Sequence, residues 1–236
     1  MQTPSVITLL NGYSLATDQG NPAFCSIHLV ESGAGRVLFD CGHVGRRARL
    51  LAALSDRGLT PADIDTVVLS HGHWDHLQNA DLFEHSRVLL HPDELRFLAS
   101  PSPGIPRWAK AVLDGLDVHE TGEGDELIPG VKVLELVGHT PGSIGLAVET
   151  SEGRAVLAAD AVPTAAELRS CRASGHPTDQ AKADASVQRV AALADLVYPG
   201  HDEPLRISSA GEFEYAGDGA PLVFRGSSRI RSEGLP

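Results

Sequence analysis

The chain has 236 residues, of which 42% are hydrophobic and 21% charged, and its formal net charge is −12. These values are typical of a globular domain and exclude a disordered or fibrous chain, while the acidic balance disfavours a nucleic-acid partner. No apolar run reaches the ~20 residues of a membrane helix, and the N-terminus lacks a basic, apolar leader. The three cysteines are widely spaced, which fits reduced thiols, so we expect a cytoplasmic protein without a membrane segment.

Short strands dominate the predicted N-terminal half, because apolar and β-branched residues there are separated by glycine-containing turns. The predicted strands are residues 5–10, 25–30, 36–40, 65–70 and 87–91. Between residues 46 and 59, three leucines recur at helical spacing and Gly58 ends the pattern, which predicts a helix. The basic cluster at its start fits a solvated helix face better than an anion site.

The C-terminal half repeats this order of strands followed by a helix. A helix is expected from Pro92, a proline-rich loop at 99–106 and a second helix at 107–116. Further strands are predicted at 131–137, 144–150, 155–159 and 196–198, with an amphipathic helix at 179–196 before the last. This order predicts an α/β fold of two similar halves packed as a sandwich with helices outside. We expect one domain over 1–236, with a core at about 5–208 and a C-terminal extension at 209–236.

Four potential metal ligands fall within six residues, namely His71, His73, Asp75 and His76 in the string HGHWDH. Neutral imidazoles together with a carboxylate suit zinc, iron or manganese. The string follows the predicted buried strand, and Gly72 lets the backbone turn sharply at its end. Burying several imidazoles without a partner is unfavourable, and a bound cation removes that cost. The sequence therefore predicts a metal site here.

Three more candidate ligands stand at the ends of other predicted strands. His139 follows Val137-Gly138, Asp160 follows the apolar run that ends at Ala159, and His201 follows Pro199-Gly200. A lone histidine at a strand end is more commonly a capping or surface residue. The repeated placement behind glycine or alanine favours a shared site with the first motif.

The strings HGHWDH at 71–76, GHTPGS at 138–143, AAD at 158–160 and PGHD at 199–202 resemble the metal motifs of the metallo-β-lactamase superfamily. The resemblance implies a four-layer αβ/βα sandwich with the site at one edge between its two sheets. It also implies two ligand sets: His71, His73 and His139 for a first metal, Asp75, His76 and His201 for a second, with Asp160 bridging the two.

The motif set is most similar to hydroxyacylglutathione hydrolases, acyl-homoserine-lactone lactonases and the short metallo-β-lactamase-domain-containing proteins. The segment LADLVYPGHDEPLRI looks most like the last group. By the same resemblance, Asp40 matches an early aspartate of the family and would orient a ligating imidazole through its free N–H.

The resemblance implies a hydrolase with two divalent ions, zinc first and iron or manganese as alternatives. The ions would lower the pKa of a shared water, and the resulting metal-bound hydroxide would attack an ester, thioester or lactone carbonyl of a small molecule. Asp75 would orient the hydroxide as a catalytic residue as well as bind metal. Two alternatives remain: a phosphodiesterase or nuclease of the same fold, and a mononuclear iron enzyme similar to persulfide dioxygenases.

The substrate pocket is expected from three loop segments, residues 13–24, 99–108 and 162–178. Trp74, between two ligands, either lines the mouth of this pocket or packs on a neighbouring loop. Ser70 and Cys41 lie near the motif and are interpreted as structural. The same interpretation, structural or solvated, applies to the histidines without ligand context: His28, His85, His91, His119 and His176.

Overall fold

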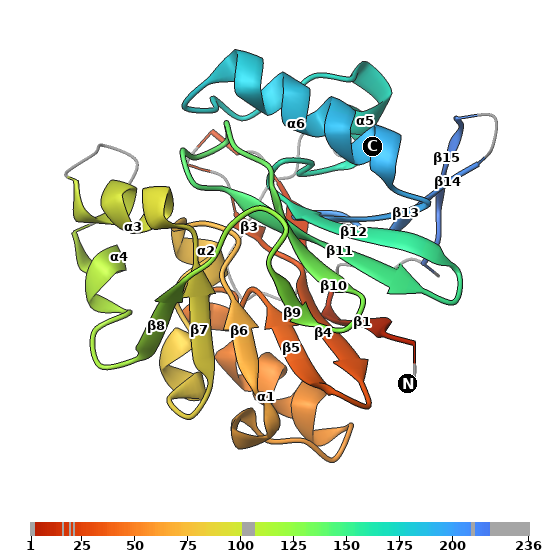
Figure 1. Cartoon of the computed structure of the whole chain (residues 1–236). Coiled ribbons are helices and arrows are strands. Elements are labelled where there is room, and N and C mark those ends of the chain that lie inside the picture. The colour runs from red at the N-terminus through yellow and green to blue at the C-terminus, as the bar shows by residue number, and fades with distance from the viewer. Residues whose placement is uncertain are drawn as a thin grey trace, which may run out of the picture.

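The fold has four layers. The computed structural model describes residues 3–15, 17–18, 20, 22–100, 107–208 and 211–217. Two large sheets face each other, and helices cover the outer side of each (Figure 1). The predicted four-layer αβ/βα sandwich is confirmed.

The first sheet has the strand order β1-β4-β5-β6-β7-β8. The first three strands pair antiparallel, whereas β5 to β8 run parallel, connected by helices on the outer face. Because parallel strands end at the same edge of a sheet, the segments that follow β5, β6 and β7 meet there. The bounds are β1 Ser5–Leu10, β4 Ile27–Ser32, β5 Gly35–Phe39, β6 Thr66–Val68, β7 Arg87–Leu90, β8 Asp117–Glu120, α1 Arg47–Ser55, α3 Pro92–Ala99 and α4 Trp108–Ala111.

The second sheet has the order β15-β14-β13-β12-β11-β10-β9 and is antiparallel except for the pair β12 and β13. Two helices connect that parallel pair and cover the outer face of the sheet (Figure 1). The bounds are β9 Glu126–Ile128, β10 Val131–Glu135, β11 Ile144–Thr150, β12 Gly153–Ala159, β13 Leu196–Pro199, β14 Leu205–Ile207, β15 Phe213–Tyr215, α5 Ala165–Ser170 and α6 Gln180–Leu193.

The first half of the chain also contains several small elements. A two-stranded ribbon pairs β2 with β3, and a four-residue helix, α2, follows β6. Their bounds are β2 Tyr13–Ser14, β3 Ala23–Phe24 and α2 Trp74–Leu77, with 3₁₀ turns at Val44–Arg46, Pro61–Asp63 and Ala80–Phe83.

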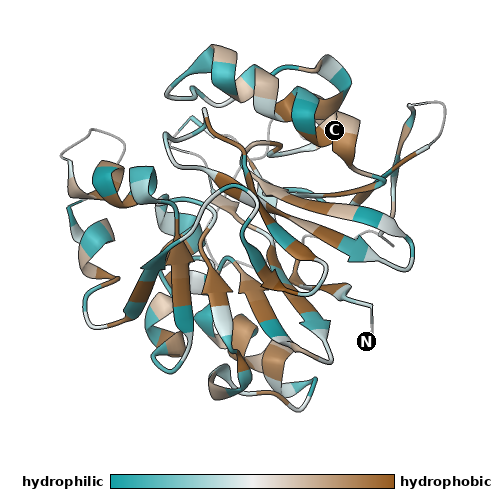
Figure 2. Ribbon diagram, in the orientation of Figure 1, coloured by the Kyte–Doolittle hydropathy of each residue, from teal (hydrophilic) through white to brown (hydrophobic). Residues whose placement is uncertain are grey.

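Apolar side chains fill the three spaces between the layers. Along β4, Ile27 and Leu29 pack toward the helices of the first sheet, while Val30 packs between the sheets. Likewise Leu157 of β12 lies between the sheets and Val156 lies under α5 and α6. Successive side chains of a strand point to opposite faces, so a strand buried on both sides carries apolar residues on both faces. Figure 2 shows this as hydrophobic strands between helices with hydrophilic outer faces.

The predicted strands of the core are confirmed within a few residues, and α6 begins after Asp179, whose side chain accepts a hydrogen bond from the Lys182 N–H. The helix predicted at 107–116 is wrong in length, because only Trp108–Ala111 is helical and turns follow. Residues 101–106 of the predicted loop lie outside the described residues. The edge strands β8 and β9, the strand β14 and the helix α5 were missed, because short, half-exposed elements carry little apolar periodicity.

The predicted C-terminal extension contains β15, which pairs with β14 at the edge of the second sheet. The single-domain boundary stays a prediction. Among the described residues, the structure has no helix with the length and apolar character needed to cross a bilayer.

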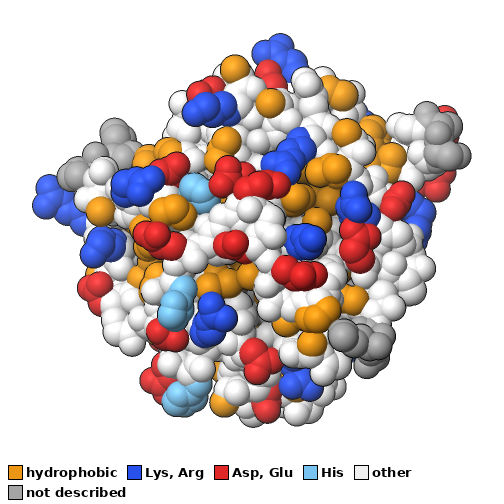
Figure 3. Space-filling model, in the orientation of Figure 1, with side chains coloured by type: hydrophobic (Ala, Val, Ile, Leu, Met, Phe, Trp, Pro, Cys, Tyr) orange, Lys and Arg blue, Asp and Glu red, His pale blue; other side chains and the backbone are white. Residues whose placement is uncertain are grey.

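Charges of both signs are interspersed on the face of the molecule shown in Figure 3. Ion pairs between charged side chains of the described residues include Arg189 with Glu123 at 2.6 Å and Arg154 with Glu149 at 2.7 Å. Such exposed pairs contribute little to stability. On this face the negative net charge is therefore not gathered into one patch.

Candidate metal centre

All seven predicted ligands converge at the edge where strands of the two sheets end. The first sheet contributes the motif after β6, and the second contributes the loop after β10 and the ends of β12 and β13. The residues are His71 and His73 after β6, Asp75 and His76 in α2, His139 before β11, Asp160 after β12 and His201 after β13.

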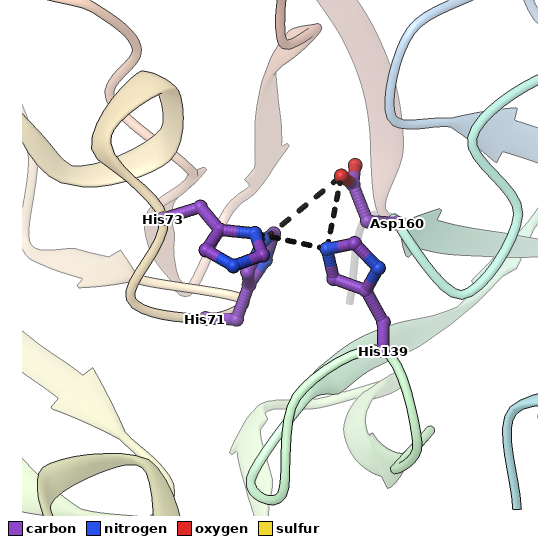
Figure 4. Close-up of side chains that lie close together, drawn as sticks. All are labelled: His71, His73, His139 and Asp160. Atoms are coloured by element: carbon purple, nitrogen blue, oxygen red, sulfur yellow. Dashed lines mark hydrogen bonds and ion pairs between the residues drawn. The ribbon is translucent and has the colours of Figure 1, made fainter. Parts of the chain in front are cut away.

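A first group of donor atoms comes from His71, His73, His139 and Asp160, whose side chains point toward one another (Figure 4). The His73 Nδ1 atom lies 2.9 Å from both His71 Nε2 and His139 Nε2. The Asp160 Oδ2 atom lies 3.3 Å from His139 Nε2 and 3.9 Å from His71 Nε2. Three ring nitrogens and one carboxylate oxygen thus surround one point.

A second group lies on the other side of the same aspartate. The Asp160 Oδ1 atom is 3.4 Å from His76 Nε2 and 3.3 Å from His201 Nε2. The Asp75 Oδ2 atom is 3.8 Å from His76 Nε2 and 3.5 Å from His201 Nε2. Asp160 therefore gives one oxygen to each group, and the two groups are adjacent.

The donor atoms fit divalent cations. Among the residues that the structure describes, none is a hydrogen-bond partner of the buried atoms His76 Nε2 and Asp160 Oδ1. Leaving such atoms buried without a partner is costly, and a cation between them removes the cost. Imidazole nitrogens with carboxylate oxygens are also a donor set that zinc commonly takes.

The protonation states suit metal binding as well. Burial lowers the pKa of His71 well below 6.5 and that of His73 to about 3, so both rings are neutral near pH 7. Burial acts to raise the pKa of Asp160, but the neighbouring His201 and His76 outweigh it and hold that pKa well below 3.8. Metal ligands must be neutral imidazoles and ionised carboxylates, and His71, His73 and Asp160 meet this condition. Burial acts to lower the pKa of His76 and of His201, but nearby acidic groups, Asp160 among them, outweigh it and raise both values, so a metal bound at the second group would displace protons from these rings.

Asp40 fixes the orientation of the second group, as expected from its position. Its Oδ2 atom accepts a hydrogen bond from His76 Nδ1 at 2.8 Å, which leaves His76 Nε2 free for the centre. Both carboxylate oxygens also accept from Ser70, one from its N–H at 2.7 Å and one from its hydroxyl at 2.9 Å. The Ser70 hydroxyl lies 2.9 Å from His71 Nδ1, so it supports the first group too.

Asp40 adopts a φ of 60°, an uncommon backbone conformation for a non-glycine residue. Its N–H donates to the Val68 carbonyl at 2.9 Å, which holds this conformation at the end of β5.

Gly200 allows the end of β13 to approach the centre. A Cβ atom at this position would lie 2.2 Å from Asp160 Oδ1, so any other residue would displace the carboxylate. The Gly200 carbonyl accepts from the Ser26 N–H at 2.6 Å, and His201 Nδ1 lies 3.3 Å from the Tyr13 carbonyl oxygen. The chain before β4 therefore positions the last ligand.

Four aromatic rings, which we call the aromatic row, flank the centre: Tyr13, Phe24, His43 and Trp74. Neighbouring ring centroids are 5.4 Å apart for Tyr13 and Phe24, and 5.0 Å for each of the next two pairs. All four are half-buried. Trp74 packs edge-on against His43. The aromatic row therefore extends from Tyr13, whose carbonyl oxygen lies near His201, to Trp74 in the middle of the first motif.

The other histidines lie outside the two donor groups. His91 accepts a hydrogen bond at the start of α3 and its Nε2 atom is 3.2 Å from Glu135. His28 is buried and lies 3.2 Å from the Thr8 hydroxyl, whereas His85 and His176 are exposed.

The predicted pocket segments are only partly described. Residues 101–106, 16, 19 and 21 lie outside the described residues, and the pocket stays a prediction. The segment 162–178 ends beside the centre, because the Thr178 N–H donates to the His139 carbonyl at 3.2 Å. The sequence analysis missed Glu94, a buried residue beside the centre. Its carboxylate accepts hydrogen bonds from both loops of the first group, and nothing in its local sequence indicates this.

Comparisons with known proteins agree with this geometry and confirm the family resemblance. The family model described as "Metallo-beta-lactamase superfamily" matches residues 20–201. The metallo-beta-lactamase domain-containing protein 1 of Xenopus laevis is 34% identical over 213 residues, covering 88% of this chain and 84% of that protein. The N-acyl homoserine lactonase AiiB of Agrobacterium fabrum is 33% identical over 171 residues, covering 63% of this chain and 60% of that lactonase.

Solved structures share the fold at lower identity. The structure of AidC, described as a dizinc quorum-quenching lactonase in complex with a product, N-hexanoyl-L-homoserine, has a TM-score of 0.66 and 22% identity. The match covers 87% of this chain and 81% of that chain.

Proposed function

The chain belongs to the metallo-β-lactamase superfamily and is a metal-dependent hydrolase, and on that premise we propose that it cleaves an ester, thioester or lactone of a small molecule using two divalent ions. The observation that carries the proposal is the pair of adjacent donor groups that share Asp160. A centre for one ion has no need of the second group.

The proposed ligands are those of the two donor groups. Zinc is the proposed metal, since the donors are imidazole and carboxylate and a structural relative is described as a dizinc enzyme. Two such ions supply Lewis acidity and lower the pKa of a water toward neutrality when they are bound. His71, His73 and His139 would hold the first ion, Asp75, His76 and His201 would hold the second, and Asp160 would serve both.

Asp75 is the proposed catalytic residue. Its carboxylate is almost fully buried, and its Oδ2 atom lies 3.8 Å from His76 Nε2 and 3.5 Å from His201 Nε2. In this role it would orient the attacking water as well as bind the second ion. Asp40 keeps the proton of His76 on Nδ1, so that the Nε2 atom stays available at the centre.

The aromatic row favours a substrate with an apolar acyl part. Half-buried aromatic rings offer a large apolar surface for such a group. A relative described as an N-acyl homoserine lactonase supports an acylated substrate of this kind. We therefore place the acyl group along Tyr13, Phe24 and Trp74, with its carbonyl at the centre.

The test is a substrate panel with zinc-loaded protein: p-nitrophenyl acetate, an acyl thioester, an N-acyl homoserine lactone and bis-p-nitrophenyl phosphate. We expect turnover of at least one carbonyl substrate, and loss of it in the His71→Ala, His73→Ala double variant. Turnover of the phosphodiester alone would establish the nuclease alternative instead. One iron per chain with oxygen uptake would establish the mononuclear alternative.

A further inference from the structure

We propose that Glu94 is a positioning residue that clamps together the two loops carrying His71, His73 and His139, and so sets the affinity of the first donor group for its ion. The inference rests on the proposed metal ligands.

The Glu94 carboxylate joins the two loops directly. It lies on α3 and is fully buried. Its Oε1 atom accepts from the Gly72 N–H at 2.8 Å, and Gly72 lies between His71 and His73. Its Oε2 atom accepts from the Thr140 hydroxyl at 2.7 Å and from the Gly142 N–H at 3.0 Å, in the loop that begins with His139.

These hydrogen bonds require a carboxylate. Two of the three donors are backbone N–H groups, which cannot accept, so both Glu94 oxygens must act as acceptors. Hydrogen bonds to an ionised acceptor are about twice as strong as neutral ones. A single side chain therefore holds two loops that are far apart in the sequence.

Close packing against α3 leaves these loops little freedom. A Cβ atom on Gly142 would lie 2.3 Å from the Glu94 nitrogen, and one on Gly72 would lie 2.5 Å from Leu98 Cδ2. The start of α3 is held in turn by His91, whose Nε2 atom lies 3.2 Å from Glu135 of β10. The helix thus acts as a fixed support for both loops.

The second donor group has supports of its own. Asp40 orients His76, and the Tyr13 carbonyl lies 3.3 Å from His201 Nδ1. The hydrogen bonds of Glu94 go to Gly72, Thr140 and Gly142, and they reach neither His76 nor His201. Loss of the clamp should therefore weaken the first group more than the second.

The test is Glu94→Gln, which keeps the shape of the side chain but places an NH₂ group against one of the N–H donors. Affinity for each of the two zinc ions is measured by competition with a chromophoric chelator, and coordination by the visible spectrum of the cobalt(II) form. We expect affinity at one of the two sites to fall roughly 10- to 100-fold, the usual effect of removing a partner that supports metal ligands. The cobalt spectrum should change with it.

The matched control is Glu167→Gln. Glu167 is another buried glutamate that accepts from a backbone N–H and a hydroxyl, those of Thr164 at 2.9 and 2.8 Å, at the start of α5. We expect it to lower thermal stability without altering either zinc affinity. Equal weakening in both variants would reduce Glu94 to a merely structural role and overturn the proposal, as would unchanged zinc binding in Glu94→Gln.

Thr140→Val decides the question if Glu94→Gln fails to fold, because it removes only one of the three donors. We expect weaker zinc binding at the same site, and unchanged binding would overturn the clamp. None of these measurements uses turnover. A protein that binds zinc as expected but hydrolyses no carbonyl substrate would refute the proposed function and leave the clamp intact.

Discussion

Replacing Asp40 with asparagine should misplace the proton of the His76 imidazole. Asp40 now gives one oxygen to His76 Nδ1 at 2.8 Å and the other to the Ser70 N–H at 2.7 Å. An amide has a single oxygen. If that oxygen stays with Ser70, the NH₂ group faces Nδ1, and the ring proton must move to Nε2, the atom proposed to bind the second ion. If the amide turns round, the buried Ser70 N–H loses its acceptor.

Either arrangement removes one hydrogen bond to a buried charged group, which contributes about 1.5–3 kcal/mol. For a chain of this length, each kcal/mol shifts the melting temperature by roughly 2–4 °C, so the metal-free Asp40→Asn variant should melt about 3–12 °C lower. The affinity for the second ion should fall roughly 10- to 100-fold, because the supporting partner of a ligand is lost.

The assay combines chelator competition with ¹⁵N NMR of the histidine rings, which distinguishes the two neutral tautomers. Asp125→Asn is the control, since Asp125 also accepts from a hydroxyl and a backbone N–H, those of Thr121 and Gly122 at 3.0 Å each, but in a turn away from the centre. The reasoning is refuted if Asp40→Asn binds both ions as tightly as the wild type while His76 keeps its proton on Nδ1.

Four further outcomes are expected. Gly200→Ala should weaken zinc binding more than about tenfold, because its Cβ would lie 2.2 Å from Asp160 Oδ1, and full zinc content after dialysis would contradict this. Zinc at ~1,000 times its dissociation constant should add about 4 kcal/mol of stability, or roughly 8–16 °C in melting temperature, and a chelator that leaves the melting temperature unchanged would argue against a metal centre. Burial lowers the pKa of His28 from 6.5 to about 3, so the ring stays neutral in the native state. Below pH 6.5 only the unfolded state takes up a proton on this ring, so the free energy of unfolding decreases as the pH falls. At about pH 4.5 the wild type should have lost ~2.7 kcal/mol of unfolding free energy for this reason, as measured by urea unfolding. The His28→Leu variant should not show this loss. An equal pH dependence of the two proteins would show that the ring is protonated in the folded state. Trp74→Ala should raise KM for a long-chain acyl substrate about tenfold while sparing an acetyl ester, and equal effects on both would remove Trp74 from the acyl site.

The sequence by itself determined the features that are local along the chain. The buried parts of β4 and β12 carry mostly apolar residues, because both of their faces are covered. The ligand types and the turns that aim them are also local, as in the motif at 71–76 directly after β6. The edge strand β8 was not predictable in this way, since its side chains are mostly exposed and carry no apolar pattern.

The division of the ligands into two sets was implied by the family resemblance and by no local pattern, and the tertiary structure decided how they are arranged and supported. The two oxygens of Asp160 face different donor groups, and this depends on where β12 ends relative to α2 and β13. Glu94 meets Thr140 across 46 positions of sequence, and Asp40 meets His76 across 36. The sequence does not distinguish Glu94 from an ordinary helical glutamate. Hydrogen bonds between distant segments produce no periodic pattern in the sequence, so only the packing of the folded chain shows its partners.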